Sequence, residues 1–332
     1  EVKEAYDLVS GESERITTYQ YRTPVVDDII RIKKYRMDNG EQILIAYSYR
    51  ALDEFGRVYR QYDYGVKNGS TYTPQRTSYW YDEEGAVIKI KNQNGTFEKT
   101  VYDGAGRVKA RYLSYDLEEA DSDYEAAKTI LGDTVIEQTS YTYDKAGNKI
   151  LSVSFQRLPG AQGEGELSSS NGRPHSTARW YDKLGRIEVA CDYGAVVKTS
   201  RPSTRPGAST ETERTTRYVY GDSLIEGRRW EYSQAEDCTI SGREIDALGR
   251  TVLSWKKSAD SDDYRVKSLR YDALGHVVRE TVYQNREALM KPGFEFGQAP
   301  PHWTAAELND ASPCTTQYVW GVVREEWTGQ PG

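Results

Sequence analysis

Aromatic side chains alternate with polar ones over short stretches of this chain. Four Tyr-x-Tyr pairs show the pattern most clearly: Tyr19/Tyr21, Tyr47/Tyr49, Tyr79/Tyr81 and Tyr141/Tyr143. A period of two residues is that of a β-strand, because successive side chains point to opposite faces. The pattern therefore predicts an all-β chain in which rings lie in rows on the faces of a sheet.

The motif Asp-x-x-Gly occurs seven times between these stretches. Asp at the first position and Gly at the fourth are typical of a type I turn. The carboxylate accepts hydrogen bonds from amides two residues on, and glycine adopts a positive φ at little cost. Such a turn followed by a left-handed glycine is a three-residue hairpin loop with a bulge. We therefore expect a hairpin tip at Asp53/Gly56, Asp82/Gly85, Asp103/Gly106, Asp144/Gly147, Asp182/Gly185, Asp246/Gly249 and Asp272/Gly275.

The residues that flank the motif predict the register of each hairpin. Tyrosine precedes the Asp in five copies, and arginine follows the Gly in four (Arg57, Arg107, Arg186 and Arg250). In the bulged register the Asp lies opposite the residue after Gly, and the tyrosine lies opposite a Val or Ile. This predicts Asp–Arg pairs on one face and four aromatic–aliphatic pairs on the other: Tyr81–Val87, Tyr102–Val108, Tyr181–Ile187 and Tyr271–Val277.

The hairpins form one array over residues 1–332 in this interpretation. A degenerate copy begins at Tyr218 and continues through Gly227 and Arg228, and Tyr318 begins a last partial copy. Repeats with open edges are stabilised by their neighbours. Since the chain also starts at Glu1 in mid-pattern, we expect a fragment of a larger shell whose partners are the rest of the parent chain or neighbouring copies.

Two tracts and two short helices interrupt the strands. Residues 159–176 are rich in Gly and Ser, and residues 200–213 are rich in Pro, Ser and Thr, which predicts loop-like insertions. Ser122 and Glu125 form a capping-box pattern for a helix that Gly132 ends. A second helix is expected to start at Thr304, with Glu307 three residues on.

Composition narrows the possible partners. The chain has 51 acidic and 44 basic side chains, a formal net charge of −7, which argues against nucleic acid and anionic membranes as partners. No apolar run approaches the roughly 20 residues of a membrane span, so we expect no membrane insertion by this segment.

The sequence contains only weak signals for catalytic or metal-binding sites. The acidic clusters Asp27-Asp28, Asp121/Asp123 and Asp260/Asp262/Asp263 offer carboxylates for a glycosidase, but a chain with 51 acids contains such clusters by chance. The Asp-Ser-Asp strings also lack the Gly and Glu of a calcium loop. His175, His276 and His302 do not have metal-ligand spacing, and Cys191, Cys238 and Cys314 contain no C-x-x-C pair. We therefore expect no catalytic residue, no metal, no cofactor and no enzymatic activity.

The repeated motif also resembles a known family. Tyr-Asp-x-x-Gly-Arg-(Val/Ile) is similar to the signature of YD-repeat, or Rhs-repeat, proteins, and the best copies begin at Tyr102, Tyr181 and Tyr271. That family includes bacterial Rhs and wall-associated proteins, toxin-complex shell subunits and teneurins. The resemblance extends from about residue 47 to residue 283. It implies a secreted or surface protein, most simply a bacterial one.

The resemblance implies more about fold and processing. Hairpins in this family wind side by side into a continuous spiral sheet that encloses a hollow shell. Toxin members enclose a C-terminal segment in that shell and cut it off with an aspartate autoprotease. The family's Asp-Pro-x-Gly core motif has no match here, so autoproteolysis is not carried over to any residue of this chain.

Two functions remain open from the sequence. The favoured one is a structural shell segment that encapsulates or displays a polypeptide such as a toxin. The alternative is a surface adhesin that binds glycans or a partner protein through exposed aromatic residues. Besides the tyrosines, the aromatic candidates on expected strands are Trp80, Trp180, Trp230, Trp255 and Trp320. Asn68 and Asn94 match glycosylation acceptors but are also turn signals.

Overall fold

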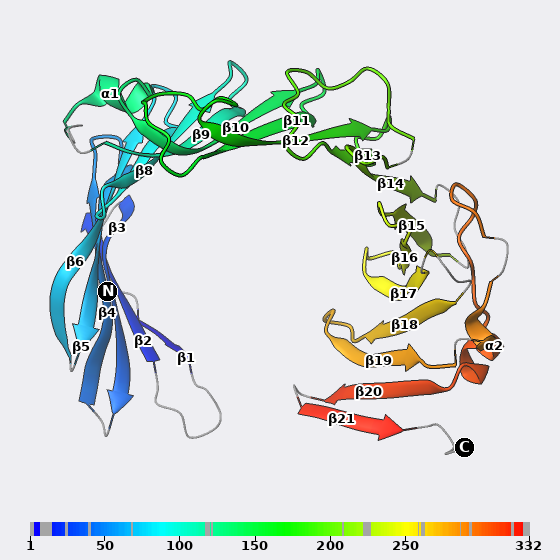
Figure 1. The fold of residues 1–332 in the computed structure, drawn as a ribbon. Coiled ribbons are helices and arrows are strands. Elements are labelled where there is room, and N and C mark those ends of the chain that lie inside the picture. Colours follow the sequence, from blue (N-terminus) through cyan, green and yellow to red (C-terminus); the bar gives the residue numbers. More distant parts are fainter. Residues whose placement is uncertain are drawn as a thin grey trace. The chain divides into compact units, whose positions relative to one another are not determined.

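The computed structural model describes residues 3–6, 15–23, 26–38, 41–67, 69–116, 120, 122–207, 209–221, 227–257, 259, 263–285, 287–291, 294–319 and 322–327. These residues contain 21 strands, two short α-helices and one 3-10 helix (Figure 1). Within each unit described below, each strand pairs antiparallel with the next along the chain. The prediction of an all-β chain of antiparallel hairpins with short helical insertions is confirmed. No helix in the described part of the chain is long and apolar enough to cross a membrane.

The chain divides into two compact units. Unit 1 comprises Glu1–Thr142 and Ser152–His175, and unit 2 comprises Tyr143–Leu151 and Ser176–Gly332. The sequence alone predicts a single array and gives no sign of this division. Strands β10 (Thr134–Tyr143), β11 (Lys149–Arg157) and β12 (Gly172–Tyr181) contribute residues to both units.

The strands of unit 1 pair in chain order from β1 to β10. The first nine are β1 (Lys3–Tyr6), β2 (Arg15–Thr23), β3 (Val26–Asp38), β4 (Glu41–Leu52), β5 (Val58–Lys67), β6 (Ser70–Tyr81), β7 (Val87–Asn92), β8 (Thr96–Tyr102) and β9 (Val108–Tyr115).

Two insertions cover one face of β7 to β10 in unit 1. Helix α1 (Tyr124–Lys128) contacts β7 and β8, and Leu167 from the second insertion packs with Tyr112 and Val135. Lys99, which is 2% exposed, fixes α1 to the sheet: its Nζ donates to Ala126 O at 2.7 Å, to Thr129 O at 2.7 Å and to Asp133 at 2.9 Å. A buried lysine of this kind is tolerated because a carboxylate and two carbonyls replace its water shell.

Two details of these insertions differ from the sequence prediction. The side chain that caps α1 is Asp123, which accepts from Ala126 N at 2.9 Å, and not Ser122. Aspartate one residue later is an equally good cap, so the pattern alone does not choose between them. The insertion predicted for residues 159–176 ends at residue 171, because β12 already begins at Gly172. The second predicted tract, residues 200–213, ends where β14 begins at Arg214.

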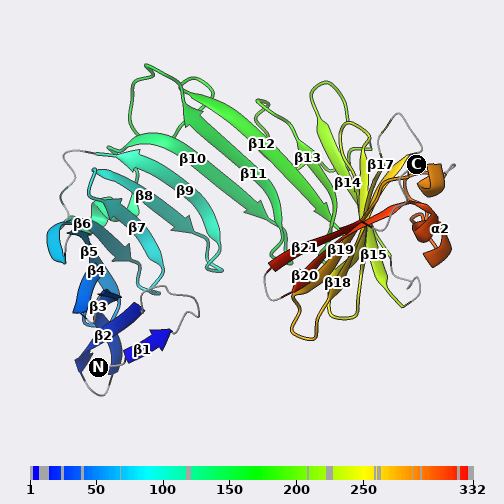
Figure 2. The same cartoon turned by 90° about the horizontal axis from the view of Figure 1, so that it is seen from below.

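The strands of unit 2 also pair in chain order, from β12 to β21 (Figure 2). They are β13 (Ile187–Asp192), β14 (Arg214–Tyr220), β15 (Arg229–Gln234), β16 (Ile240–Ile245), β17 (Thr251–Lys257), β18 (Tyr264–Tyr271), β19 (Val277–Tyr283), β20 (Pro313–Val319) and β21 (Val322–Trp327).

The core of unit 2 lies between one face of this sheet and the described residues of 284–312. That segment contains the 3-10 helix η1 (Glu287–Leu289) and helix α2 (Ala305–Asp310), which begins with the capping box predicted at Thr304 and Glu307. Trp303 and Leu289 pack on Trp255, Tyr264 and neighbouring buried side chains. Gly242 makes this packing possible, because a Cβ there would lie 2.3 Å from the Trp255 ring.

Candidate functional site

The structure places all seven Asp-x-x-Gly motifs at hairpin tips of one geometry. At Asp182, the amide donates to Arg186 O at 2.9 Å, and Gly185 N donates to Asp182 O at 3.1 Å. The same two backbone bonds occur in the other six copies. The seven glycines, which have φ between 72° and 91°, are Gly56, Gly85, Gly106, Gly147, Gly185, Gly249 and Gly275. Only glycine adopts this conformation without strain, so the tip depends on it.

The Asp carboxylate holds the tip together from inside. Asp182 Oδ1 accepts from Leu184 N at 2.8 Å and Arg186 N at 2.9 Å, and Oδ2 accepts from Arg186 Nε at 2.6 Å. The copies that begin at Asp53, Asp103 and Asp246 have the same three bonds. His276 and Asn148 replace arginine at two tips and bond Asp272 and Asp144 in its place, whereas Asp82 accepts from the amide of Ala86.

The hairpins have the register that the flanking residues predict. Tyr102 is the partner of Val108 and Tyr181 is the partner of Ile187, and a register shift precedes each of these pairs. Tyr81 with Val87 and Tyr271 with Val277 follow the same rule. The extra residue at each shift is the bulge that a type I turn with a left-handed glycine produces.

In four copies of the motif, the tyrosine hydroxyl bonds the preceding hairpin. Each donates to the carbonyl of the residue two after the previous motif's glycine: Tyr81 to Val58 at 2.6 Å, Tyr102 to Val87 at 3.1 Å, Tyr181 to Lys149 at 2.7 Å and Tyr271 to Thr251 at 2.7 Å. The degenerate copy keeps this bond, because Tyr220 donates to Ile187 O at 2.9 Å. We call this recurring contact the tyrosine stitch.

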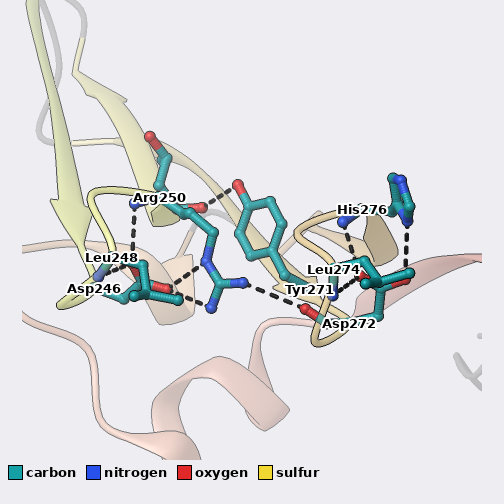
Figure 3. Close-up of polar contacts among 8 residues, drawn as sticks. Asp246, Leu248, Arg250, Tyr271, Asp272, Leu274 and His276 are labelled. Atoms are coloured by element: carbon teal, nitrogen blue, oxygen red, sulfur yellow. Dashed lines mark hydrogen bonds and ion pairs between the residues drawn. The ribbon is translucent and has the colours of Figure 1, made fainter.

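Arginine reinforces the stitch from the preceding tip. The Arg250 guanidinium lies 4.7 Å from the centre of the Tyr271 ring, and its Nη1 donates to Asp272 O at 3.3 Å (Figure 3). Arg57 lies over Tyr81 at 4.5 Å and Arg186 over Tyr220 at 4.4 Å. Cation–π contacts of this kind contribute about 0.5–1 kcal/mol at exposed sites.

These contacts add a feature that the sequence prediction does not include. The predicted faces concern residues within one hairpin, whereas here the arginine of one hairpin meets the tyrosine of the next. The tyrosine hydroxyl was the signal for this contact in the sequence. A partly buried hydroxyl needs a hydrogen-bond partner, and packing on valine provides none. The Asp–Arg–Tyr set is therefore a lateral connection between repeats.

The tips also perturb the pKa of their aspartates. Hydrogen bonds from the side chain and amide of Arg107 hold the pKa of Asp103 below its usual value. The backbone amide of Arg250 is the main cause of the same shift at Asp246. At Asp53 and Asp182 burial raises the pKa, but the hydrogen bonds from Arg57 and Arg186 outweigh it and lower the net value.

The other candidate residues from the sequence do not gather into a site among the described residues. Asp123 caps α1, and His276 occupies the arginine slot of its tip. His302 Nδ1 lies 3.4 Å from Glu244 Oε1, and Cys191, Cys238 and Cys314 are free thiols. No cluster of metal-ligating side chains occurs in the described part of the chain. The side chains of Asp27 and Asp28, and all of Asp121, Asp260 and Asp262, lie outside it.

The aromatic candidates divide by exposure. Trp180 and Trp255 are 6% and 4% exposed, so they are core residues and do not offer exposed rings to a glycan. Trp80 and Trp230 are half-buried, and Trp320 lies outside the described residues. Asn94 is a turn residue whose side chain accepts from Thr96 N at 3.1 Å, while Asn68 lies outside the described residues.

Comparison with known proteins finds similarity only among solved structures. No protein-family model and no curated protein matches the sequence. Similar structures include a Tc holotoxin pore of Photorhabdus luminescens, with 11% identity and a TM-score of 0.24 over 95% of this chain and 20% of that one. A second is TcdB2–TccC3, with 10% identity and a TM-score of 0.23 over 93% of this chain and 21% of that one. A third is TcdB2–TccC3 without its hypervariable C-terminal region, with 11% identity and a TM-score of 0.22 over 99% of this chain and 22% of that one. The chain spans about a fifth of the length of these chains.

The two glycines of one tip give a matched test of the turn geometry. A Cβ at Gly106 or at Gly104 meets no atom within 4 Å, but only Gly106 has a positive φ, of 72°. We expect Gly106→Val to lower the free energy of unfolding by roughly 1–3 kcal/mol, the usual strain of a side chain in this region. Gly104→Val serves as the control in denaturant titrations, and equal losses from the two variants would contradict the assigned turn.

The tyrosine stitch is tested by removing one oxygen atom. Tyr271→Phe removes the bond to Thr251 O and keeps the ring under Arg250. We expect a loss of about 0.5–1.5 kcal/mol in the free energy of unfolding, since one hydrogen bond disappears and a carbonyl loses its partner. Tyr218→Phe is the control, because Tyr218 lies in the same unit and its hydroxyl makes no hydrogen bond to a described residue. A Tyr271→Phe protein as stable as wild type would show that the stitch contributes nothing.

The lowered aspartate pKa values predict a defined acid sensitivity. Because folding lowers the pKa of Asp103 from its usual 3.8, the contribution of its tip is complete above about pH 4 and is lost as pH falls through the folded value. Asp103→Asn is therefore expected to melt below wild type at pH 6, and the gap should narrow by pH 2. Thermal melts across this range test it, with the exposed Glu98→Gln as control. A gap that stays constant with pH would refute this account.

Proposed function

We propose that this chain is a non-catalytic structural segment of a YD-repeat shell that encapsulates or displays a polypeptide. The proposal extends to a secreted or cell-surface location and to partners drawn from the rest of the parent shell or from neighbouring copies.

The observation that supports the proposal is the tyrosine stitch. The tyrosines and arginines that recur in most repeats bond the tip itself or the preceding hairpin, as with Tyr181 on Lys149 O and Arg250 on Tyr271. Repeats whose recurring side chains serve lateral cohesion are typical of arrays in which each unit is stabilised only by its neighbours. The simplest role for these bonds between hairpins is to hold a continuous β-sheet wall together.

The chemistry of the tips also favours a structural role. A catalytic acid or base needs a pKa near the working pH. The pKa values of the shifted tip aspartates are lowered, away from the working pH. Their carboxylate oxygens accept hydrogen bonds from amides and from arginine, as at Asp103. These groups are poorly suited to exchange protons with a substrate.

Association of the purified chain tests the wall-forming role. Strand edges carry free N–H and C=O groups and pair readily with another chain. We expect concentration-dependent association in light scattering, and contacts through strand edges in cryo-microscopy. Val319 and Val322 close the β20–β21 hairpin, so alternate amides of β21, including that of Glu325, point away from β20. Glu325→Pro removes one of these edge donors and should weaken association; Lys183→Pro, in an exposed turn, is the control. A chain that remains monomeric at all concentrations would overturn this role.

Lack of catalysis needs its own test. The purified chain is incubated with broad panels of glycoside, peptide and ester substrates, and no turnover above buffer is expected. Turnover that a single Asp or Cys substitution abolishes would overturn the non-catalytic part of the proposal.

A second candidate function, glycan binding, is favoured by one groove in unit 2. The groove has a volume of about 360 Å³ and includes Tyr218, Tyr220 and the ion pair between Arg243 and Glu231 at 2.5 Å. Rings beside hydrogen-bonding groups suit a sugar. A glycan array separates the two functions. Glycan binding that Tyr218→Ala removes would favour the adhesin function, and absence of glycan binding would favour the shell function.

A further inference from the structure

Unit 1 carries two parallel rows of side chains across strands β2 to β6 (blue to cyan in Figure 1). Directly paired residues of neighbouring strands share a face of the sheet. The first row consists of Gln20, Arg31, Tyr49, Tyr62 and Arg76, and the second of Thr18, Lys33, Tyr47, Tyr64 and Pro74. Because the rows are two residues apart on every strand, they lie on the same face. We call these ten residues the tyrosine–cation face.

The rings of this face are stacked on one another. Tyr47 and Tyr64 have ring centres 4.7 Å apart at 25°, and Tyr49 and Tyr62 have centres 5.8 Å apart at 28°. Cations continue both stacks, since Lys33 Nζ lies 5.5 Å from the Tyr47 ring and the Arg31 guanidinium lies 5.8 Å from the Tyr49 ring. Both flat sides of Tyr47 and Tyr49 are thus engaged, and one side each of Tyr62 and Tyr64. The ring edges and hydroxyls remain for a partner.

The face is positively charged within an acidic chain. Its ten residues include Arg31, Lys33 and Arg76 and no carboxylate, whereas the whole chain has a net charge of −7. The nearest acid in the pairing, Asp63, belongs to the row between and faces the other side, where it accepts from Ser48 Oγ at 2.6 Å. Charge complementarity therefore selects an anionic partner.

The described insertions of unit 1 cover other strands. Helix α1 contacts β7 and β8, and Leu167 packs among residues of β9 and β10. All four tyrosines of the face remain half-exposed, and Arg31 is exposed. The face is therefore a surface on which the described part of unit 1 places no covering insertion.

We propose that the tyrosine–cation face binds an acidic polypeptide in an extended conformation. Arg31 and Lys33 are two residues apart on one strand, so their side chains emerge about 6.8 Å apart. Carboxylates at alternate positions of an extended peptide have the same spacing. Each carboxylate then accepts a charge-assisted hydrogen bond from Arg31 or Lys33, and tyrosine hydroxyls donate to the oxygens that remain.

The same geometry disfavours two other anionic partners. Single-stranded nucleic acid depends on rings with free flat sides for base stacking, and Tyr47 and Tyr49 have none because a ring and a cation occupy their two sides. A sugar ring cannot stack on these two tyrosines for the same reason, so hydrogen bonding to anionic groups is favoured over ring stacking. The inference stands apart from the proposed shell function, because a chain that never associates can still bind such a peptide.

Binding of a short fluorescein-labelled polyglutamate to the full chain tests the proposal by fluorescence anisotropy. We expect saturable binding that weakens as salt is raised, since the contacts are ionic. Arg31→Gln/Lys33→Gln should weaken binding about tenfold, the scale of losing two charge-assisted contacts. The matched control is Lys34→Gln, an exposed lysine on the same strand whose side chain faces the other side.

Each other outcome overturns the proposal. If Lys34→Gln weakened polyglutamate binding equally, the binding would be general electrostatic attraction and not recognition by this face. Tighter binding of a heparin oligosaccharide or a DNA oligonucleotide of equal charge would assign the face to that class of partner. Absence of polyglutamate binding by the wild type at low salt would remove the site altogether. Circular dichroism confirms that the variants fold, and Arg31→Gln alone replaces the double variant if that protein does not.

Discussion

The hydrogen bond from a tyrosine hydroxyl to a carbonyl of the preceding hairpin is the contact on which the rest of this structure depends. A lone two-stranded hairpin is only marginally stable in water, because it buries too little surface to offset its loss of conformational entropy. The stitch adds one side-chain bond to the backbone ladder between hairpins, at Tyr81, Tyr102, Tyr181, Tyr220 and Tyr271. At Tyr81, Tyr220 and Tyr271, the arginine of the preceding tip also packs on the ring.

This lateral device explains why the chain needs so few aliphatic side chains. Most of the apolar packing lies where an insertion covers a sheet face, as with Trp303 and Leu289 over Trp255 in unit 2. Elsewhere the rings have one polar end, and a ring bonded through its hydroxyl is satisfied beside water. The sheet is thus stable as a single layer over much of its area, and its open faces are free to carry other functions.

The two open surfaces differ in chemistry. The tyrosine–cation face of unit 1 presents Arg31 and Lys33 beside stacked rings, whereas the groove of unit 2 presents Tyr218 and Tyr220 beside an Arg–Glu pair. An excess of cations selects anions, and a neutralised pair beside rings suits an uncharged polar ligand. Repeats of one architecture can therefore present different surfaces, because the stitch uses only the tip residues and leaves the strand positions between them unconstrained.

The sequence by itself determined the hairpins, because turn chemistry and alternation are local: Asp182, Gly185 and the pair of Tyr181 with Ile187 follow from a few adjacent residues. It also located the capping box at Thr304. Only the tertiary structure decided what the tyrosine hydroxyl bonds, since its partner lies 15 to 33 residues away in a neighbouring hairpin. The covering of Trp255, the division into two units and the grouping of Arg31 with Tyr49 are long-range in the same way. These three features depend on the register between hairpins, which no local sequence pattern specifies.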